Sequence, residues 1–373
     1  MRSLLYAAFL LLSQAAGGWA ERPGYTTVLL YHRFDESAYP STNISVDKFR
    51  QQMQYLRDNE YRVLSMEAFR QLLSSGEPFP QKTVLITIDD AYRSIYERAF
   101  PVLKEFDYPF TVFADAKRLY SNAPGALTWA MVEEMRAWGA TVANHSYDHP
   151  KIGRPQKGHT REAYAAWVRQ DLSKAQQALA DHGMASDVLA YPYGEYNEVV
   201  VEIARDLGFE IMFAQDEGAV DERTDPRRIP RFAIVGKNLD MDRFVFKLNT
   251  APLHVVEVEP NAVELAQNPP EGFSMRLLDP KRYRPGVINM FVSEWGRVDA
   301  QFDRGTGVFS YRCSTALTRP MNRLIVTARE KESGHFSMFS RPYFLPFKEL
   351  GGATKRLPLR SFVYRLRTAV SRM

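Results

Sequence analysis

The sequence predicts an α/β fold, a parallel sheet or barrel over about two-thirds of the chain, followed by a small β-sandwich. Thr83–Ile88 reads TVLITI, an almost unbroken run of β-branched residues and leucine that suits a strand buried on both faces. Strand-like and helical segments alternate from Thr27 to Phe213, which is the order of a parallel α/β layer. After Pro252, short β-like runs lie between turn residues, as in an antiparallel sandwich.

The strands expected in the first part are short runs rich in apolar, mostly β-branched and aromatic residues. They are Thr27–Tyr31, Thr83–Ile88, Phe110–Phe113, Ala140–Ala143, Val188–Tyr191 and Phe209–Phe213. Helices are expected to begin at Ser45, Ser65, Thr128, Thr160 and Asn197, and a further helix is expected to end at Phe106. Ser45 and Ser65 suit the N-cap, because a hydroxyl oxygen accepts a hydrogen bond from an unpaired N–H of the first turn.

The second part has six β-like runs bounded by clusters of Gly, Pro, Asn and Asp. They are Val255–Val258, Phe273–Leu277, Val287–Val292, Val308–Tyr311, Arg323–Ala328 and Phe336–Phe339. We therefore divide the chain into a signal segment at 1–20, an α/β domain at 26–250, an accessory β-sandwich domain at 253–345 and a basic tail at 348–373.

The first twenty residues have the features of an export signal. Arg2 gives a positive start, Leu4–Leu12 an apolar stretch, and Gly18-Trp19-Ala20 a small-x-small cleavage site. The apolar stretch is too short to span a bilayer, so we expect an exported protein, periplasmic or secreted. Cys313 is the only cysteine, which excludes an intramolecular disulfide.

The charge of the chain is unevenly placed. The formal net charge is +4, but residues 348–373 carry +6, from seven basic residues against Glu349, and residues 21–347 carry −3. Leu357–Arg372 has the pattern of a basic amphipathic helix. We expect this tail to contact an anionic membrane or cell wall, and we expect no nucleic-acid partner. The alternative is a helix that folds back over an apolar patch of the sandwich.

Two carboxylates, Asp89 and Asp90, follow the buried strand Thr83–Ile88 without a break. Parallel strands present their chemistry at their carboxyl ends. Two buried acids repel each other, and each is costly to bury alone, so a bound cation is the economical explanation. The alternative is that Asp90 only caps a helix beginning near Tyr92.

His145 and His149 follow another strand end with the spacing i, i+4, which brings both imidazoles to one side of a helix or turn. Two imidazoles and one carboxylate are a common ligand set for a catalytic divalent metal. Taken alone, this pair of histidines is equally compatible with a surface coincidence. A third segment, Tyr191-Pro192-Tyr193-Gly194, has the composition of a tight turn that can aim a backbone N–H into a pocket, or of an ordinary structural turn.

Together these segments resemble the motifs of the polysaccharide deacetylases, carbohydrate esterase family 4, whose catalytic unit is the NodB-homology domain. The resembling sequences are TIDDA, NHSYDHP and AYPYGEYN, in the family's order along residues 26–250. The opening VLLYHRF and the form AYPYGEYN look most like the periplasmic branch that acts on poly-β-1,6-N-acetylglucosamine. The resemblance implies a distorted (β/α) barrel and gives no support to residues 253–373.

The resemblance also implies roles for individual residues. Asp90, His145 and His149 would be the metal ligands, with zinc expected ahead of cobalt or nickel. Asp89 would be the general base, and the backbone N–H of Tyr193 would bind the oxyanion that develops on the acetamide carbonyl. An acid must also protonate the departing amine, because an amide anion is a very poor leaving group.

Two departures from the family pattern bear on these roles. Ala190 stands where the third motif usually has an arginine that orients the base, and Arg231 is a possible replacement. The late Leu-x-His that usually supplies the acid is not evident; His254 fits it superficially but reads as the start of the sandwich. His32, at the end of the first strand, is the better candidate acid, with a structural role behind the ligands as its alternative.

The sequence therefore predicts a hydrolase that removes acetyl groups from an acetylated amino-sugar polymer, an exopolysaccharide such as poly-N-acetylglucosamine. Peptidoglycan and chitooligosaccharide are alternative substrates within the same class. A carbohydrate-binding protein with a decayed catalytic centre is the alternative from another class. A component of exopolysaccharide machinery is a further expected partner.

Overall fold

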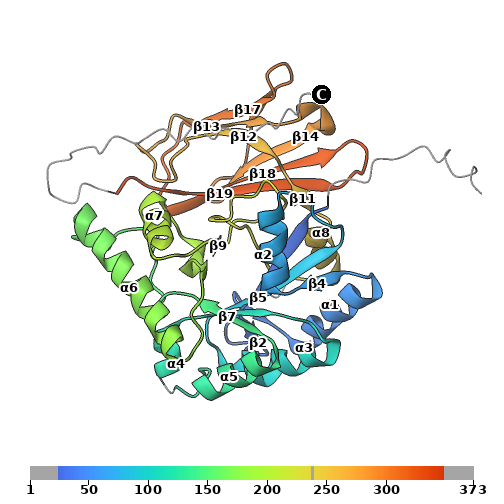
Figure 1. The fold of residues 1–373 in the computed structure, drawn as a ribbon. Helices are drawn as coiled ribbons and strands as arrows, with labels where there is room; N and C mark the ends of the chain where they lie inside the picture. The colour runs from blue at the N-terminus through green and yellow to red at the C-terminus, as the bar shows by residue number, and fades with distance from the viewer. Residues whose placement is uncertain (1–23, 122, 237–238, 348–373) are drawn as a thin grey trace, which may run out of the picture.

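The computed structural model describes residues 24–121, 123–236 and 239–347 (Figure 1). The expected signal segment at 1–20 and the basic tail at 348–373, including the helix expected at Leu357–Arg372, lie outside the described residues. Across the residues that are described, no helix is long and apolar enough to cross a bilayer.

The first region is built on an eight-stranded parallel sheet that curls into a half-barrel (Figure 1). Its strands are β1 (Thr26–Tyr31), β4 (Arg62–Leu64), β5 (Thr83–Asp89), β6 (Thr111–Ala114), β7 (Thr141–Asn144), β8 (Val188–Ala190), β9 (Ile211–Phe213) and β10 (Phe232–Ala233). The order is β10-β1-β5-β6-β7-β8-β9, with β4 also paired to β5. The segment between β9 and β10 connects the two outer strands of this sheet. Ile229 pairs with Phe213 of β9, and Phe232 of β10 pairs with Leu29 of β1.

Strand β5 lies at the centre of the half-barrel, and all seven of its residues are buried. It pairs with β1 along one edge, from Thr83 to Ile88. On the other edge it pairs with β4 near its amino end and with β6 near its carboxyl end. This double-sided pairing explains the unbroken β-branched sequence, because no residue of the strand faces water.

Most helices cover the outside of the curled sheet, and one, Met66–Ser75, packs against the apolar core on its inner face (Figure 1). They are α1 (Val46–Asp58), α2 (Met66–Ser75), α3 (Phe100–Phe106), α4 (Ala116–Tyr120), α5 (Trp129–Trp138), α6 (Arg161–Asp181), α7 (Glu198–Asp206) and α8 (Met241–Leu248). The expected helix starts are confirmed: the side chains that accept a hydrogen bond from the first turn are those of Ser45, Ser65, Thr128, Thr160 and Asn197. A π-helical turn, Ile95–Ala99, leads into α3, and the short strands β2 (Arg33–Phe34) and β3 (Asn43–Ile44) pair with each other.

The second region consists of two facing sheets, as the sequence predicted. Its strands are β11 (Ala251–Pro252), β12 (Val255–Glu259), β13 (Gly272–Leu277), β14 (Tyr283–Val292), β15 (Gly296–Val298), β16 (Gln301–Asp303), β17 (Val308–Arg312), β18 (Met321–Glu330) and β19 (Phe336–Phe344). One sheet has the order β11-β19-β18-β14-β15 and the other β12-β13-β17-β16. Their inner faces share one apolar core, in which Phe273, Met290 and Val326 are buried.

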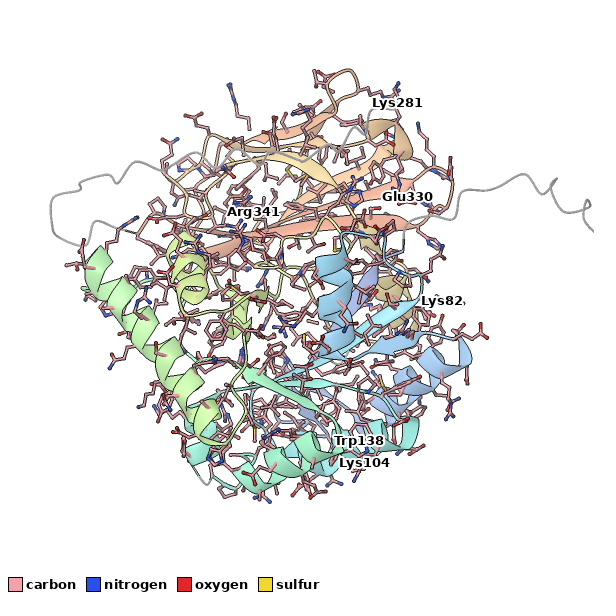
Figure 2. All side chains as sticks on the ribbon, viewed as in Figure 1. Lys82, Lys104, Trp138, Lys281, Glu330 and Arg341 are labelled. Carbon is pink, nitrogen blue, oxygen red and sulfur yellow. The ribbon has the colours of Figure 1, made fainter. Side chains whose placement is uncertain are left out.

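The five-stranded sheet also packs on the half-barrel through its outer face (Figure 1). Ile325 and Met338 contact the main apolar core of the first region, while Met321 and Phe344 contact the core around α6 and α7. Side chains fill the boundary between the two regions, where Arg341 is seen in Figure 2. The sandwich is therefore joined to the half-barrel by apolar contacts along β18 and β19.

Candidate metal centre

The two carboxylates of TIDDA lie at the carboxyl end of β5, as the sequence predicted. Asp89 is the last residue of the strand and is fully buried, and Asp90 is 3% exposed. Asp90 has φ 68°, a left-handed conformation that is strained for a residue with a side chain. The helical segment that follows begins at Arg93, so Asp90 lies outside its N-cap position, which speaks against its alternative role as a helix cap.

The two histidines lie on a loop that begins where β7 ends. The side-chain oxygen of Asn144 accepts a hydrogen bond from the N–H of Ser146 at 2.7 Å, and the Ser146 hydroxyl accepts one from the N–H of His149 at 3.0 Å. Asp171 of α6 accepts two further backbone N–H groups of the loop, each at 3.1 Å. The loop that carries His145 and His149 is thus held in place before any ligand binds.

Asp90, His145 and His149 converge, and one ligand atom from each lies within 4.8 Å of the others. Nε2 of His149 is 3.1 Å from Oδ1 of Asp90 and 3.2 Å from Nε2 of His145. Nδ1 of His145 lies 2.7 Å from the carbonyl oxygen of Ala190, to which it can donate, which leaves the Nε2 lone pair facing the cluster.

The donor set fits a divalent cation. Oδ1 of Asp90 is buried and has no hydrogen-bond partner among the described residues, although a buried carboxylate oxygen needs one. Burial, followed by the nearby His145, lowers the pKa of His149 to about 4, so its imidazole is neutral and free to ligate. Two neutral imidazoles and one ionised carboxylate are a ligand set that suits zinc and related metals.

Asp89 faces away from the solvent and is held by Arg231, which is also fully buried. Nη1 and Nη2 of Arg231 donate to the two oxygens of Asp89 at 2.6 and 2.8 Å. Nε of Arg231 donates to the carbonyl oxygen of Ala214 at 2.7 Å, which fixes the plane of the guanidinium. Burial is the largest effect on the pKa of Asp89 and raises it. The charge and hydrogen bonds of Arg231, with the nearby His145 and His32, together outweigh burial and hold that pKa at about 2.

Arg231 thus occupies the place that the sequence suggested for it, as the replacement for the arginine missing at Ala190. Its position follows from the segment that closes the sheet order between β9 and β10, which directs the side chain inward. Burying both charges is tolerated because they meet in a two-bond geometry.

The turn at Tyr191–Gly194 lies beside the ligands. Tyr193 has φ 58° and ψ 7°, and its ring centre is 4.6 Å from that of His149. Gly194 has φ 65°, and a Cβ there would lie 2.4 Å from the backbone nitrogen of Gln215, so only glycine fits. The turn is therefore rigid and close to the metal ligands; the role of the Tyr193 N–H stays a prediction.

His32 follows β1 and is 9% exposed, with no hydrogen-bond partner for Nδ1 among the residues described. Burial lowers its pKa, and the charges of Asp89 and Asp90 act in the opposite direction. The imidazole therefore lies within electrostatic reach of both carboxylates, where the sequence argument expected it.

Asp115 is a residue of this site that the sequence analysis missed. It follows β6, and its Oδ1 accepts the N–H of Ala91 at 3.0 Å, which supports the turn after Asp90. Nε of Arg118 donates to both of its oxygens, at 3.2 and 3.1 Å. Burial raises the pKa of Asp115 to about 6, an effect that Arg118 reduces. An acid directly after the apolar strand TVFA was the available signal, the same one that identified Asp89 and Asp90.

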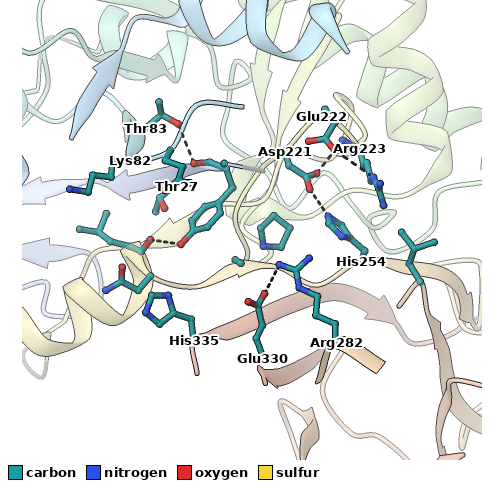
Figure 3. A pocket seen from close by; sticks show the side chains of 18 of the residues that line it. Thr27, Lys82, Thr83, Asp221, Glu222, Arg223, His254, Arg282, Glu330 and His335 are labelled. Atoms are coloured by element: carbon teal, nitrogen blue, oxygen red, sulfur yellow. Dashed lines mark hydrogen bonds and ion pairs between the residues drawn. The ribbon is translucent and has the colours of Figure 1, made fainter. Parts of the chain in front are cut away.

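His254 does not join this cluster. Its imidazole contacts the carboxylate of Asp221 in a cavity of about 490 Å³ (Figure 3). The same cavity is lined by Thr27 and Thr83, which lie at the beginning of β1 and β5, at the amino edge of the sheet. His254 is therefore at the opposite edge from Asp89, and the interpretation of it as the start of the sandwich is the better one.

A buried carboxylate paired with an arginine lies beside three side chains that could hold a metal ion, at the carboxyl edge of a parallel α/β half-barrel. The family model described as polysaccharide deacetylase matches residues 76–212, which include Asp89, Asp90, His145 and His149. Residues 76–212 thus carry a polysaccharide deacetylase domain.

Relatives and solved structures agree with that assignment. Poly-β-1,6-N-acetyl-D-glucosamine N-deacetylase of Staphylococcus aureus is 26% identical over 197 residues, 52% of this chain and 68% of the relative. IcaB from Ammonifex degensii is 29% identical with a TM-score of 0.51, over 57% of this chain and 92% of that one. The Streptococcus pyogenes deacetylase PplD, solved with acetate, shares the fold at 23% identity and TM-score 0.54, over 61% of this chain and 99% of that one.

Proposed function

We propose that the protein is a metal-dependent N-deacetylase of an acetylated amino-sugar exopolysaccharide, such as poly-N-acetylglucosamine. The observation that carries this proposal is the convergence of Asp90, His145 and His149 beside the Asp89–Arg231 pair. The reaction would hydrolyse an acetamide to a free amine and acetate. The named activity of the Staphylococcus aureus relative supports the choice of polymer.

The first half of the reaction needs a base that is ionised at neutral pH. A divalent cation held by Asp90, His145 and His149, with zinc as our first choice, would supply Lewis acidity toward the acetamide carbonyl and the attacking water. Asp89 stays ionised because its pKa is about 2, and each of its oxygens keeps a lone pair beyond the bond from Arg231. It can therefore take a proton from the water while Arg231 keeps it in orientation.

The second half needs an oxyanion donor and an acid. The backbone N–H of Tyr193 belongs to a turn whose geometry is fixed beside His149, so it would cost no reorganisation during the reaction. His32 would protonate the departing amine; burial lowers its pKa below the ordinary value, and the charges of Asp89 and Asp90 act against that loss.

The rim of the site has aromatic rings that suit a sugar polymer. Tyr193 is 44% exposed next to His149, and Tyr39 is 51% exposed. The guanidinium of Arg33 lies between the Tyr39 and Tyr92 rings, at 3.9 and 3.4 Å, which connects Tyr39 to the turn after Asp90. Flat, exposed rings such as these can pack against the apolar faces of sugar residues.

Export to the periplasm or beyond is part of the proposal, and it rests on the signal-like residues 1–20. The +6 charge of residues 348–373 supports contact with an anionic membrane or cell wall. Truncation after residue 347 would leave hydrolysis of a short soluble oligomer unchanged and weaken adsorption to anionic vesicles, most visibly at low salt. A lower melting temperature with unchanged adsorption would contradict attachment and favour a tail that covers the sandwich.

The test of the proposed function is acetate release from a panel of acetylated polymers that differ in sugar and linkage. Poly-β-1,6-N-acetylglucosamine, chitooligosaccharide and peptidoglycan should be compared, with Asp89→Asn as the inactive control and metal content measured in parallel. We expect the first polymer to be the best substrate. Binding of a polymer without acetate release by the metal-loaded protein would instead support a carbohydrate-binding protein, an alternative weakened here because Arg231 supplies the arginine missing at Ala190.

A further inference from the structure

Strand β18 of the sandwich presents alternate residues to the half-barrel. Its burial pattern alternates along all ten residues, and the residues buried in the sandwich core include Leu324 and Val326. The residues between them face the other way, and Met321 and Ile325 contact apolar cores of the first region. Arg323 lies between these two on the same face, so its side chain is directed to the half-barrel.

Arg323 reaches two groups beside the candidate metal centre. Its Nη2 donates to the carbonyl oxygen of Tyr193 at 3.5 Å, and its Nε lies 3.6 Å from Oδ1 of Asp216. Neither this Nε nor this Oδ1 has a hydrogen-bond partner in the described part of the chain, although both atoms are buried. The two unpaired atoms therefore face each other, and their charges are opposite.

Asp216 links this contact to the base. Its backbone carbonyl accepts the N–H of Arg231 at 2.9 Å, and Oδ2 accepts the hydroxyl of Tyr196 at 2.7 Å. Arg231 holds Asp89, and Tyr196 belongs to the same segment as Tyr193. Arg323 of the sandwich therefore contacts Tyr193, in the turn proposed to bind the oxyanion. It also contacts Asp216, whose backbone carbonyl holds Arg231, the partner of Asp89.

We propose that Arg323 is a positioning residue of the deacetylase, and that the five-stranded sheet is part of the catalytic unit rather than a separate accessory module. It fixes the peptide after Tyr193 and the carboxylate of Asp216, so that the oxyanion donor and the Asp89–Arg231 pair keep their places during the reaction. The catalytic consequence of this inference rests on the proposed function. The contacts of Arg323 with Tyr193 and Asp216 do not depend on that function.

The test compares Arg323→Met and Arg323→Lys with the control Arg297→Met in the full-length protein. Methionine keeps the apolar stem of Arg323 but has no donor, and lysine keeps the charge but can serve only one of the two oxygens at a time. Arg297 is an exposed arginine on β15 of the same sheet, so its replacement controls for general effects on the sandwich.

Two readouts separate a positioning role from a structural one. Amide hydrogen exchange of the 191–197 segment should be about fivefold or more faster in Arg323→Met, and unchanged in Arg297→Met. With the metal-loaded protein and the preferred polymer, kcat should fall about tenfold while KM stays within about twofold, because an interaction specific to the transition state is weakened. Arg323→Lys should recover part of both losses.

Unchanged exchange in the 191–197 segment of Arg323→Met would overturn the inference, whether or not any polymer is hydrolysed. Faster exchange with an unchanged kcat in an active enzyme would also overturn it. Absence of acetate release from every polymer by the wild-type protein would refute the proposed function instead, and hydrogen exchange would still decide whether Arg323 holds the turn.

Discussion

The two edges of the half-barrel contain the same kinds of residue in different arrangements. At the carboxyl edge, Asp90 contacts two histidines, and one of its oxygens has no hydrogen-bond partner among the described residues. At the amino edge, His254 contacts Asp221, and Arg282 pairs with Glu330 at 2.8 Å in the same cavity (Figure 3).

The difference shows which feature of a histidine–aspartate contact indicates chemistry. A pair such as His254–Asp221 satisfies its own charges and joins the start of the sandwich to the half-barrel. In the cluster of Asp90, His145 and His149, by contrast, one buried carboxylate oxygen has no partner among the described residues, so it is available to a cation. Both edges contain histidine and aspartate, so residue type alone does not indicate a ligand site. The unpaired buried oxygen of Asp90, beside two imidazoles, does.

The largest effect is expected from removing a metal ligand. Asp90→Ala, His145→Ala and His149→Ala should each lower bound metal and acetate release together, activity by about 10⁴-fold, because three protein ligands are the minimum for an open site. Metal analysis and rate measurement on the same samples test this. Metal kept at full stoichiometry in all three variants would show that the ligands are misassigned.

The next effect is expected from Asp89→Asn. This variant keeps the shape of the side chain and leaves the ligands intact, so metal content should stay near the wild-type level. The rate should fall by about 10²–10⁴-fold, which is the usual contribution of a positioned base. If the rate remains near that of the wild type, the division of roles between Asp89 and Asp90 is wrong.

Arg231→Met should affect activity and stability together. It leaves Asp89 buried without its partner, which costs roughly 3–5 kcal/mol in the free energy of unfolding. Because the folded pKa of Asp89, about 2, lies below the ordinary 3.8, the pair adds stability above pH 3.8 that is lost as the pH falls to about 2. Acid unfolding followed by circular dichroism should show this loss in the wild type. A variant with the same profile as the wild type would argue against the buried pair.

The smallest effect on catalysis is expected at the amino edge. His254→Ala should leave acetate release within about twofold of the wild type, because the residue lies at the opposite edge from the ligands. It should lower the free energy of unfolding by roughly 1–3 kcal/mol, since the mostly buried Asp221 loses its partner. Thermal unfolding and initial rates test the two halves. A severe loss of activity in a folded variant would make His254 the acid in place of His32.

Much of this arrangement could be predicted from the sequence because local rules decide it. The N-caps fixed the helix starts, and the rule that parallel strands expose chemistry at their carboxyl ends placed Asp89, Asp90, His145 and His149 at one edge. The short strands β2, β3, β4, β10, β11, β15 and β16 were missed, because two or three paired residues have no recognisable period.

The contacts that the sequence could only suggest, or did not show, are those between distant segments. Arg231 and Asp89 are 142 positions apart, and their pairing depends on the path that closes the sheet between β9 and β10. Arg323 and Tyr193 are 130 positions apart and lie in different regions of the fold. Neither distance is encoded in a local pattern, so both contacts required the three-dimensional structure.

The most direct test of the account is metal reconstitution of the stripped wild-type protein. Acetate release from poly-β-1,6-N-acetylglucosamine should be absent without metal and should rise with added zinc or cobalt until one equivalent is bound at the cluster of Asp90, His145 and His149. Full activity in the stripped protein, or metal binding at one equivalent without acetate release, would contradict the claim that the carboxyl edge is a metal-dependent deacetylase site.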